Sequence, residues 1–178
     1  MKTTQILIAG FGGQGILFAG KFLAYKGLIE DKQVSWLPSY GPEMRGGTAN
    51  CNVILSETPI GSPIITEPDV LIAMNLPSLQ KYIGTVAPGG QVYVDSALID
   101  AKVERTDVEV FYIPATQMAK DAGIATLANM IIVGSLLENN PELSFEGTDE
   151  VVEKLVPAKK AALVDLNKKA LQLGKEFK

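Results

Sequence analysis

A glycine-rich stretch near the start of the chain has the residue types and spacing of a phosphate-binding loop. Residues 10–15 read Gly-Phe-Gly-Gly-Gln-Gly and fit the G-x-G-x-x-G pattern of dinucleotide-binding loops. A glycine turn lets the backbone approach a ligand closely, and the helix after it offers unpaired N–H groups to an anion. The same glycines could instead serve only a tight strand-to-helix turn, so both interpretations stay open. The candidate binding residues are Gly10, Gly12, Gly13, Gln14 and Gly15.

Binding of NAD at this loop is disfavoured by the residues around the second expected strand. A Rossmann NAD site needs an acidic residue at the end of that strand, about 20 residues past the loop, to hold the ribose hydroxyls. Here the strand ends at Leu37 and runs into Pro38 and Ser39, whereas Glu30 and Asp31 precede it. A basic residue for a 2′-phosphate is absent there too. The Gln14 amide could hydrogen-bond either a polar ligand edge or a neighbouring loop.

A second candidate loop spans residues 38–47 and reads Pro-Ser-Tyr-Gly-Pro-Glu-Met-Arg-Gly-Gly. Its prolines and glycines favour a loop, which we expect beside the glycine turn, at the sheet edge where such folds bind ligands. Arg45 suits recognition of phosphate or carboxylate groups. A solvated surface loop is the alternative. The candidate interface or loop residues are Tyr40, Glu43, Met44, Gly46 and Gly47.

The chain lacks most side chains that perform chemistry on their own. It contains no histidine and a single cysteine, Cys51. These counts exclude a Ser-His-Asp triad, a histidine base and an iron–sulfur cluster, which needs about four thiolates. A four-ligand structural zinc site is likewise out of reach. We therefore assign no catalytic residue and no metal site. Asp95, at the end of an expected strand, could contact a ligand or cap a helix.

Apolar runs alternating with amphipathic stretches predict an α/β, Rossmann-like fold. We expect one domain over residues 1–178, with a mostly parallel sheet and helices on both faces. The first strand, the glycine turn, a helix ending before Gly27 and the second strand should form a βαβ unit. Asn75 is a plausible N-cap. Expected strands are 5–9, 34–37, 48–56, 70–74, 92–95 and 108–113; expected helices are 14–26, 76–83, 114–121, 127–138, 148–156 and 158–177.

Composition narrows the class of partner. The net charge of −4 disfavours non-specific binding to nucleic acid or to an anionic membrane. The apolar runs are too short to span a bilayer, and the N-terminus does not read as a signal peptide. A single cysteine fits a reducing compartment. We therefore expect a cytoplasmic protein with neither nucleic acid nor membrane as a partner.

Three segments together resemble the gamma subunit of 2-oxoacid:ferredoxin oxidoreductases. They read GFGGQGILFAGKFLA, SYGPEMRGGTANCNVILS and PDVLIAMN, and the resemblance extends over nearly all of the chain. The paired loops are far more specific than a lone glycine motif. The second loop is most similar to members that act on 2-oxoglutarate or branched-chain 2-oxoacids. The pyruvate enzymes have a related unit, so the 2-oxoacid is left open.

The resemblance implies a subunit of a larger enzyme that oxidatively decarboxylates a 2-oxoacid. That enzyme converts a 2-oxoacid, coenzyme A and oxidised ferredoxin into acyl-CoA, carbon dioxide and reduced ferredoxin. In the family, thiamine diphosphate lies between alpha and beta subunits, with magnesium, and iron–sulfur clusters lie in the beta subunit or in a small ferredoxin-like delta subunit. The lack of histidine and the single cysteine agree with a gamma subunit that holds none of these, and we expect the isolated chain to be inactive.

The role of the two loops within such an enzyme has more than one interpretation. Our first hypothesis is that Gly12, Gly13, Gln14 and Gly15 face coenzyme A, with Arg45 near its phosphates or near the alpha subunit. The second is a purely architectural subunit whose glycine loop packs on its neighbours. The third is a free-standing oxidoreductase domain that binds NAD or FAD.

Overall fold

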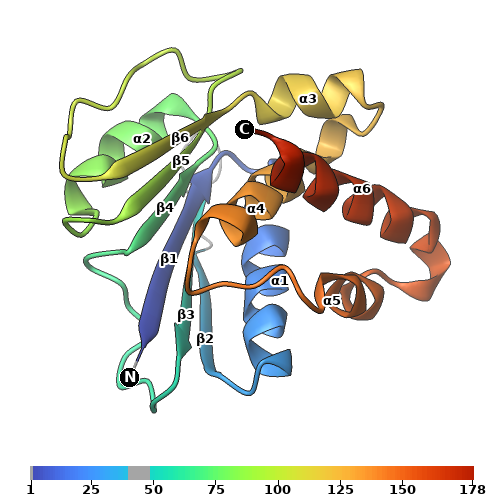
Figure 1. The fold of residues 1–178 in the computed structure, drawn as a ribbon, viewed down its shortest axis with the longest axis horizontal. Helices are drawn as coiled ribbons and strands as arrows, with labels where there is room; N and C mark the ends of the chain where they lie inside the picture. Colours follow the sequence, from blue (N-terminus) through green and yellow to red (C-terminus); the bar gives the residue numbers. More distant parts are fainter. Residues whose placement is uncertain (1, 40–48) are drawn as a thin grey trace.

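A six-stranded sheet in the order β2-β3-β1-β4-β5-β6 forms the centre of the computed structural model, which describes residues 2–39 and 49–178 (Figure 1). Its strands are β1 (Thr3–Gly10), β2 (Gln33–Ser39), β3 (Ala49–Ser56), β4 (Val70–Ala73), β5 (Gln91–Asp95) and β6 (Glu109–Ile113). The α-helices are α1 (Ile16–Ile29), α2 (Leu76–Tyr82), α3 (Ala115–Asp121), α4 (Ala128–Asn139), α5 (Thr148–Leu155) and α6 (Ala162–Glu176). Short 3₁₀ turns cover Ile83–Thr85, Ala125–Leu127 and Ala158–Lys160.

The sheet is mostly parallel, as predicted, with one antiparallel strand inside it. β1, β4, β5 and β6 pair in parallel, whereas β3 runs antiparallel to both β1 and β2. The expected βαβ unit is therefore modified, because β3 lies between its two strands. β2 and β3 are consecutive along the chain and pair antiparallel, which places β3 against β1. Hydrophobic patterning reports the burial of a strand but not its neighbour.

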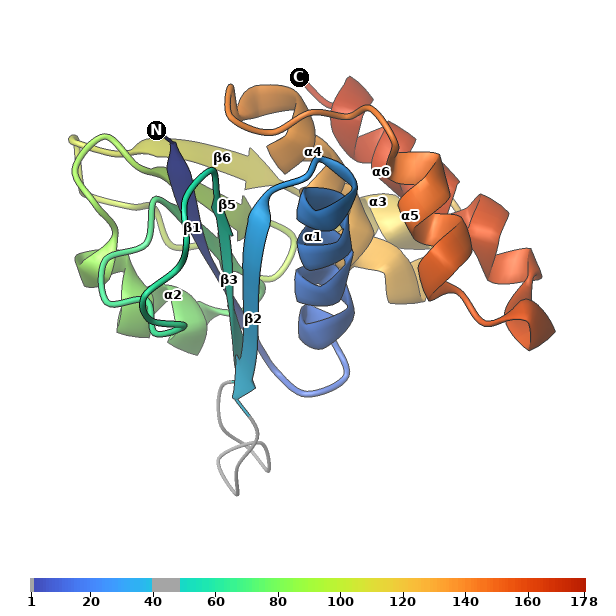
Figure 2. The same ribbon diagram turned by 90° about the horizontal axis from the view of Figure 1, so that it is seen from below.

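Helices cover both faces of the sheet, as predicted, but unequally. Ile6 and Ile8 of β1 face a large core shared with α1 and α4, while Leu7 faces a smaller core shared with α2. α5 and α6 pack outside α1 and α4. Figure 2 shows this division, with α2 on one side of the sheet and the layer of α1, α4, α5 and α6 on the other. α4 is buried between the sheet and α6, which explains why its sequence is apolar nearly all round.

Close approaches at glycines set the distances within the thicker layer. At Gly134 of α4 a Cβ would overlap the Leu171 carbonyl, and at Gly174 of α6 a Cβ would overlap the Ile131 carbonyl. Gly27 plays a similar part in α1, where a Cβ would lie 2.5 Å from Leu55 of β3. The prediction that Gly27 ends the first helix is therefore wrong. This glycine lies inside α1 and lets the helix pack closely on the sheet.

The first helix also begins later than predicted, at Ile16 instead of Gln14. Gly13 and Gly15 have φ angles of 87° and 75°, in the left-handed region that a right-handed helix excludes. The glycine loop therefore continues up to the helix start. Asn75 caps α2 as predicted, with its Oδ1 accepting a hydrogen bond from the Ser78 N–H at 2.8 Å.

Lys26 is a charged residue that the helix pattern did not mark as buried. Its side chain is 1% exposed and pairs with Glu30 on the next turn of α1, and Glu30 also pairs with Lys32 at 2.9 Å. Burial by itself raises the pKa of Glu30, but hydrogen bonds from the two lysines outweigh it and hold that pKa below its ordinary value. The charge of Lys26 is thus neutralised where α1 meets β2.

Among the described residues, no helix is both long and apolar enough to cross a membrane.

The contact between α4 and α6 yields a stability prediction. Gly174→Ala should lower the free energy of unfolding by about 1–3 kcal/mol, because the added methyl group meets backbone that must move away. Gly84→Ala is the matched control, since nothing lies within 4 Å of a Cβ at Gly84. Urea unfolding of both variants checks this expectation. Equal stabilities would show that α4 and α6 are not held at the distance described.

Candidate functional site

The glycine loop lies where the chain connections change sides of the sheet. β1 leads into α1 on one face, and the adjacent strand β4 leads into α2 on the other face. In open α/β sheets, ligands bind outside the carboxyl ends of the strands at such a switch point. Residues 11–15 come directly after β1 at this point, and Met74 comes directly after β4. The predicted loop is therefore at the edge where this fold class places ligands.

Three of the predicted glycines are required for different physical reasons. A Cβ at Gly10 would lie 2.6 Å from the Gln14 Oε1 and 2.9 Å from the Met74 Cβ, so the loop needs a bare backbone there. Gly15 combines a left-handed φ with contact against Asn129, which leaves no room for a side chain. Gly13 has a left-handed φ, but a Cβ there would meet nothing within 4 Å. Gly12 and Gly13 are both exposed.

The Gln14 side chain links the ends of the two central strands. Its Oε1 accepts a hydrogen bond from the Phe11 N–H at 2.7 Å, and its Nε2 donates to the Met74 carbonyl at 2.9 Å. Of the two contacts expected for this amide, the structure thus contains the one with a neighbouring loop. The amide closes the glycine loop and fixes it to the end of β4.

The N-terminus of α1 faces this edge without a capping side chain. Gly15 is its N-cap, and its first turn carries no acidic residue. The first N–H groups of a helix have no partner within the helix, and the helix dipole adds partial positive charge there. Phe11, Gly12 and Gly13 are exposed in front of it. The arrangement can accept an anionic group such as a phosphate.

Three adjoining hollows surround the glycine loop. The first, of about 210 Å³, lies over the switch point between Gly13, Met74 and Thr126. The second, of about 270 Å³, runs along residues 11–18 on the side of Ala49. The third, of about 380 Å³, runs from Gly15 between α4 and the α5–α6 connection. Gly13, Gly15 and Thr126 each line two of these hollows, and we refer to the three hollows together as the depression around the loop.

The third hollow has apolar walls, one buried asparagine from each of α4 and α6, and a lysine at its rim. Asn129 and Asn167 line it, are 5% and 2% exposed, and donate to the Gly15 and Leu163 carbonyls at 3.0 and 2.8 Å. Within the described part of the chain, the side-chain oxygen of each has no hydrogen-bond partner. Lys160 stands at the rim and brings a positive charge. The apolar walls are formed by Phe18, Leu127, Leu155, Val156, Pro157 and Leu163.

The second predicted loop falls on residues that the structure does not describe. Tyr40, Glu43, Met44, Arg45, Gly46 and Gly47 all lie between residues 39 and 49, outside the described ranges. The ends of that segment are placed, however. Ser39 pairs with Asn50, and Ala49 pairs with Gly10. β2 thus ends and β3 begins at the same edge of the sheet as the glycine loop.

Asp95 serves the fold. It is fully buried, accepts a hydrogen bond from the Thr116 hydroxyl at 2.5 Å and accepts another from the Ala97 N–H at 3.2 Å. Of its two predicted roles, the structure therefore contains the capping one, at the turn after β5 and the start of α3.

Cys51 is buried in the core. Burial raises the pKa of its thiol to about 12, although a hydrogen bond with Trp36 lowers that pKa, so this cysteine is an inert core residue.

The sequence analysis did not identify the polar side chains that line the third hollow. Asn129, Lys160 and Asn167 lie more than a hundred residues from the glycine loop, and neither motif nor spacing joins them to it. One signal was present. Asn129 is a polar residue at the start of an otherwise apolar helix, and such a residue needs a partner when it is buried.

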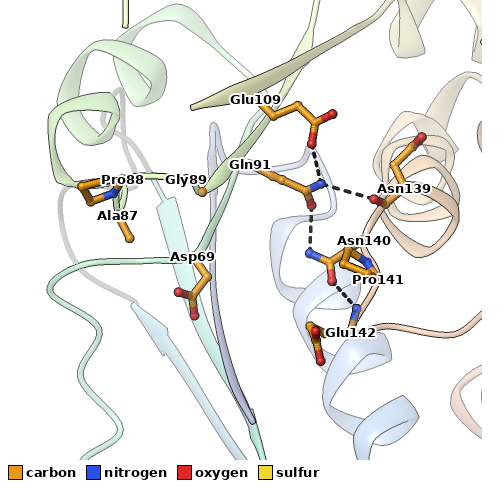
Figure 3. A pocket seen from close by; sticks show the side chains of 11 residues that line it. Asp69, Ala87, Pro88, Gly89, Gln91, Glu109, Asn139, Asn140, Pro141 and Glu142 are labelled. Carbon is orange, nitrogen blue, oxygen red and sulfur yellow. Dashed lines mark hydrogen bonds between the residues drawn. The ribbon is translucent and has the colours of Figure 1, made fainter. Parts of the chain in front are cut away.

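Another hollow, of about 370 Å³, lies at the opposite edge of the sheet, and polar side chains in its wall hydrogen-bond to one another (Figure 3). Gln91 donates to Glu109 at 2.9 Å and accepts from the Asn140 side chain at 2.8 Å. Asp69 accepts from the Gln5 N–H, and Glu142 pairs with Lys2. Its polar groups hold β5, β6 and the end of α4 together. Among the described residues, no three of His, Cys, Asp and Glu are grouped to hold a metal ion.

Comparison with known proteins gives concordant matches along the whole chain. The family model "Pyruvate ferredoxin/flavodoxin oxidoreductase" matches residues 5–177. The ketoisovalerate oxidoreductase subunit VorA of Methanothermobacter marburgensis is 36% identical over 180 residues, which cover 99% of this chain. The chain spans only 37% of the length of that relative.

Two solved structures share the fold. The gamma subunit of a keto/oxoacid ferredoxin oxidoreductase from Geobacter sulfurreducens matches with a TM-score of 0.82 and 31% identity, over 97% of this chain and 96% of that one. The 2-oxoglutarate:ferredoxin oxidoreductase of Magnetococcus marinus, with 2-oxoglutarate, coenzyme A and succinyl-CoA bound, matches with a TM-score of 0.85 and 26% identity. That match covers 98% of this chain and 31% of the other.

The two hydrogen bonds of the Gln14 amide predict that two substitutions lower the stability of the fold to different degrees. Gln14→Glu keeps an acceptor for the Phe11 N–H but places a carboxylate against the Met74 carbonyl, whereas Gln14→Ala removes both bonds. We expect each to cost about 1–3 kcal/mol of unfolding free energy, with Gln14→Glu the more harmful. Chemical denaturation measures both. Wild-type stability of Gln14→Glu would show that the link to β4 is dispensable.

Proposed function

The chain belongs to the pyruvate ferredoxin/flavodoxin oxidoreductase family, and from this premise we propose that it is the gamma-type unit of a 2-oxoacid:ferredoxin oxidoreductase. The whole enzyme would oxidatively decarboxylate a 2-oxoacid and form acyl-CoA, carbon dioxide and reduced ferredoxin. The depression around the glycine loop at the switch point is the main observation that supports a role for this chain in ligand binding. Its ligand in this proposal is coenzyme A.

The shape and polarity of the depression fit the parts of coenzyme A. A phosphate of the ligand fits at the N-terminus of α1, where N–H groups point outward and no acidic side chain opposes it. The pantetheine arm is mostly apolar, and the third hollow has apolar walls. Lys160 and, from the second loop, Arg45 supply positive charge for further phosphates.

The redox cofactors belong to other subunits in this proposal. One cysteine and no histidine cannot hold an iron–sulfur cluster. Thiamine diphosphate with magnesium would lie between alpha and beta subunits, and iron–sulfur clusters in the beta subunit or in a small ferredoxin-like subunit, with ferredoxin as the electron acceptor. The chain would then work in a reducing cytoplasm, where its buried cysteine stays a thiol.

The identity of the 2-oxoacid would be decided by those partner subunits. VorA is named for ketoisovalerate, whereas the Magnetococcus enzyme binds 2-oxoglutarate, whose second carboxylate needs a positive partner. Within the described chain, residues 11–15, 74–80, 96–99, 114–119 and 124–129 at this edge carry no charged side chain that could supply one, and we assign Arg45 of the second loop to coenzyme A. This chain therefore recognises the shared substrate, coenzyme A, and leaves the variable one to its neighbours.

A purely architectural subunit is the second candidate, and one observation favours it. The donor and acceptor of the Gln14 amide are already used within the chain. The glycine loop would then be shaped for packing against a neighbouring subunit. Kinetics of the assembled enzyme separate this role from coenzyme A binding.

The test uses two glycines with the same backbone strain. Gly13→Ala should raise the KM for coenzyme A about tenfold in the assembled enzyme, because its methyl group enters the depression, and should leave the KM for the 2-oxoacid unchanged. Gly89→Ala is the control, since Gly89 also has a left-handed φ and open space around its Cβ but lies at the opposite edge. Arg45→Ala should act in the same direction as Gly13→Ala.

Two other outcomes are informative. An unchanged KM for coenzyme A in both Gly13→Ala and Arg45→Ala would overturn the assignment of coenzyme A to this chain. Reduced assembly of Gly13→Ala, with normal coenzyme A kinetics in the complex that remains, would favour the architectural role.

A further inference from the structure

Five short segments at the carboxyl ends of the parallel strands contain no charged residue in the described chain. We call them together the carboxyl-edge face: residues 11–15, 74–80, 96–99, 114–119 and 124–129. None of these segments contains a Lys, Arg, Asp or Glu. Asp95, the nearest carboxylate before the third of these segments, is fully buried. In a chain with 20% charged residues, this is a marked local departure.

Large apolar side chains are exposed on the same face. Phe11 in the glycine loop, Leu76 at the start of α2 and Leu98 after β5 are 42%, 37% and 48% exposed. They come from the connections after three neighbouring strands, β1, β4 and β5. Neutral exposed residues lie around them: Pro77, Ala97, Gln117, Ala125 and Thr126. The cores of protein–protein interfaces have this composition, with apolar and aromatic residues enriched and charges depleted.

The opposite edge of the sheet has the reverse character. Charged side chains lie at or beside the ends of most strands there, namely Lys2, Asp31, Lys32, Glu57, Asp69, Asp107 and Glu109, and Glu142 after α4 pairs with Lys2. Several of them are paired within the chain, as Lys2 is with Glu142 and Lys32 with Glu30. The amino-terminal edge is therefore built to stay in water, and the carboxyl-edge face can lose its water at little cost, because it buries no charge.

We propose that the carboxyl-edge face is the docking surface for the partner subunit that supplies the acyl group, and that the partner meets it with an apolar, uncharged surface. This inference rests on the proposed function: coenzyme A held at the glycine loop must present its thiol to an acyl group formed on another subunit, so that subunit must cover this edge. The Magnetococcus enzyme supports an occupant from within the same enzyme, since its matching part is 31% of one longer chain. A charge on the partner would find no counter-charge within the five described segments of this face.

Leu76→Asp is the variant that tests the proposal. Leu76 lines none of the hollows around the glycine loop and is the first residue of α2, where an acidic side chain is favourable to the helix. The variant should therefore fold normally while placing a charge on the carboxyl-edge face. Ile64→Asp is the matched control, because Ile64 is 63% exposed but lies outside this face, in the connection between β3 and β4.

The experiment co-produces each variant with the other subunits of the enzyme and measures assembly by size-exclusion chromatography with light scattering. We expect Leu76→Asp to weaken assembly about 100-fold and Ile64→Asp to leave it unchanged. Normal assembly of Leu76→Asp would overturn the proposal. A homodimer of the isolated wild-type chain that Leu76→Asp dissociates would overturn it too, because the occupant would then be a second copy.

The same preparations separate this inference from the proposed function. A wild-type complex that oxidises a 2-oxoacid with coenzyme A, combined with normal assembly of Leu76→Asp, refutes only the docking surface. A complex that depends on Leu76 for assembly but shows no coenzyme A dependence refutes the proposed function and leaves the face as a subunit interface.

Discussion

The side-chain amide of Gln14 holds the two central strands together at the point where the fold changes sides. It receives the Phe11 N–H and donates to the Met74 carbonyl, so one residue closes the glycine loop and fixes it to β4. This requires Gly10 to be bare, because a Cβ there would displace the amide. With the loop fixed, α1 starts at Ile16, directly after its N-cap Gly15, and its N-terminus is open at the carboxyl edge. The hollows beside the loop, and the two sites that we propose there for coenzyme A and for a partner subunit, all depend on this arrangement.

The two edges of the sheet differ in the kinds of interaction that they contain. The amino-terminal edge holds the hydrogen bonds and ion pairs that join distant segments, such as Gln91 with Asn140 and Lys2 with Glu142. The carboxyl edge instead carries, within the described chain, the five uncharged segments of the carboxyl-edge face. Close contacts at Gly134 and Gly174 bring α4 and α6 together, and Asn129 and Asn167 lie on these two helices beside the glycine loop. The contacts that stabilise the helix layer thus also position the hollow that we propose for binding.

Local chemistry in the sequence predicted much of this. Apolar runs located the strands and helices, Asn75 indicated its own capping role, and the glycine spacing located the loop at its edge. Features that depend on distant partners could not be predicted. The pairing of β3 beside β1, the burial of Lys26 against Glu30 and the meeting of Asn129 with Gly15 each join residues that no local pattern connects. The prediction for Gly27 was wrong because the sequence does not distinguish a glycine that ends a helix from one that allows a helix to pack closely on the sheet.

Hydrogen–deuterium exchange of the assembled enzyme, with and without coenzyme A, tests most directly that the glycine loop is the coenzyme A site. We predict slower exchange in peptides covering residues 10–18 and 124–129 when coenzyme A is present. Peptides covering the opposite edge, residues 87–91 and 139–142, should exchange at the same rate in both states. Protection confined to the other subunits, or to that opposite edge, would contradict the assignment of coenzyme A to the glycine loop.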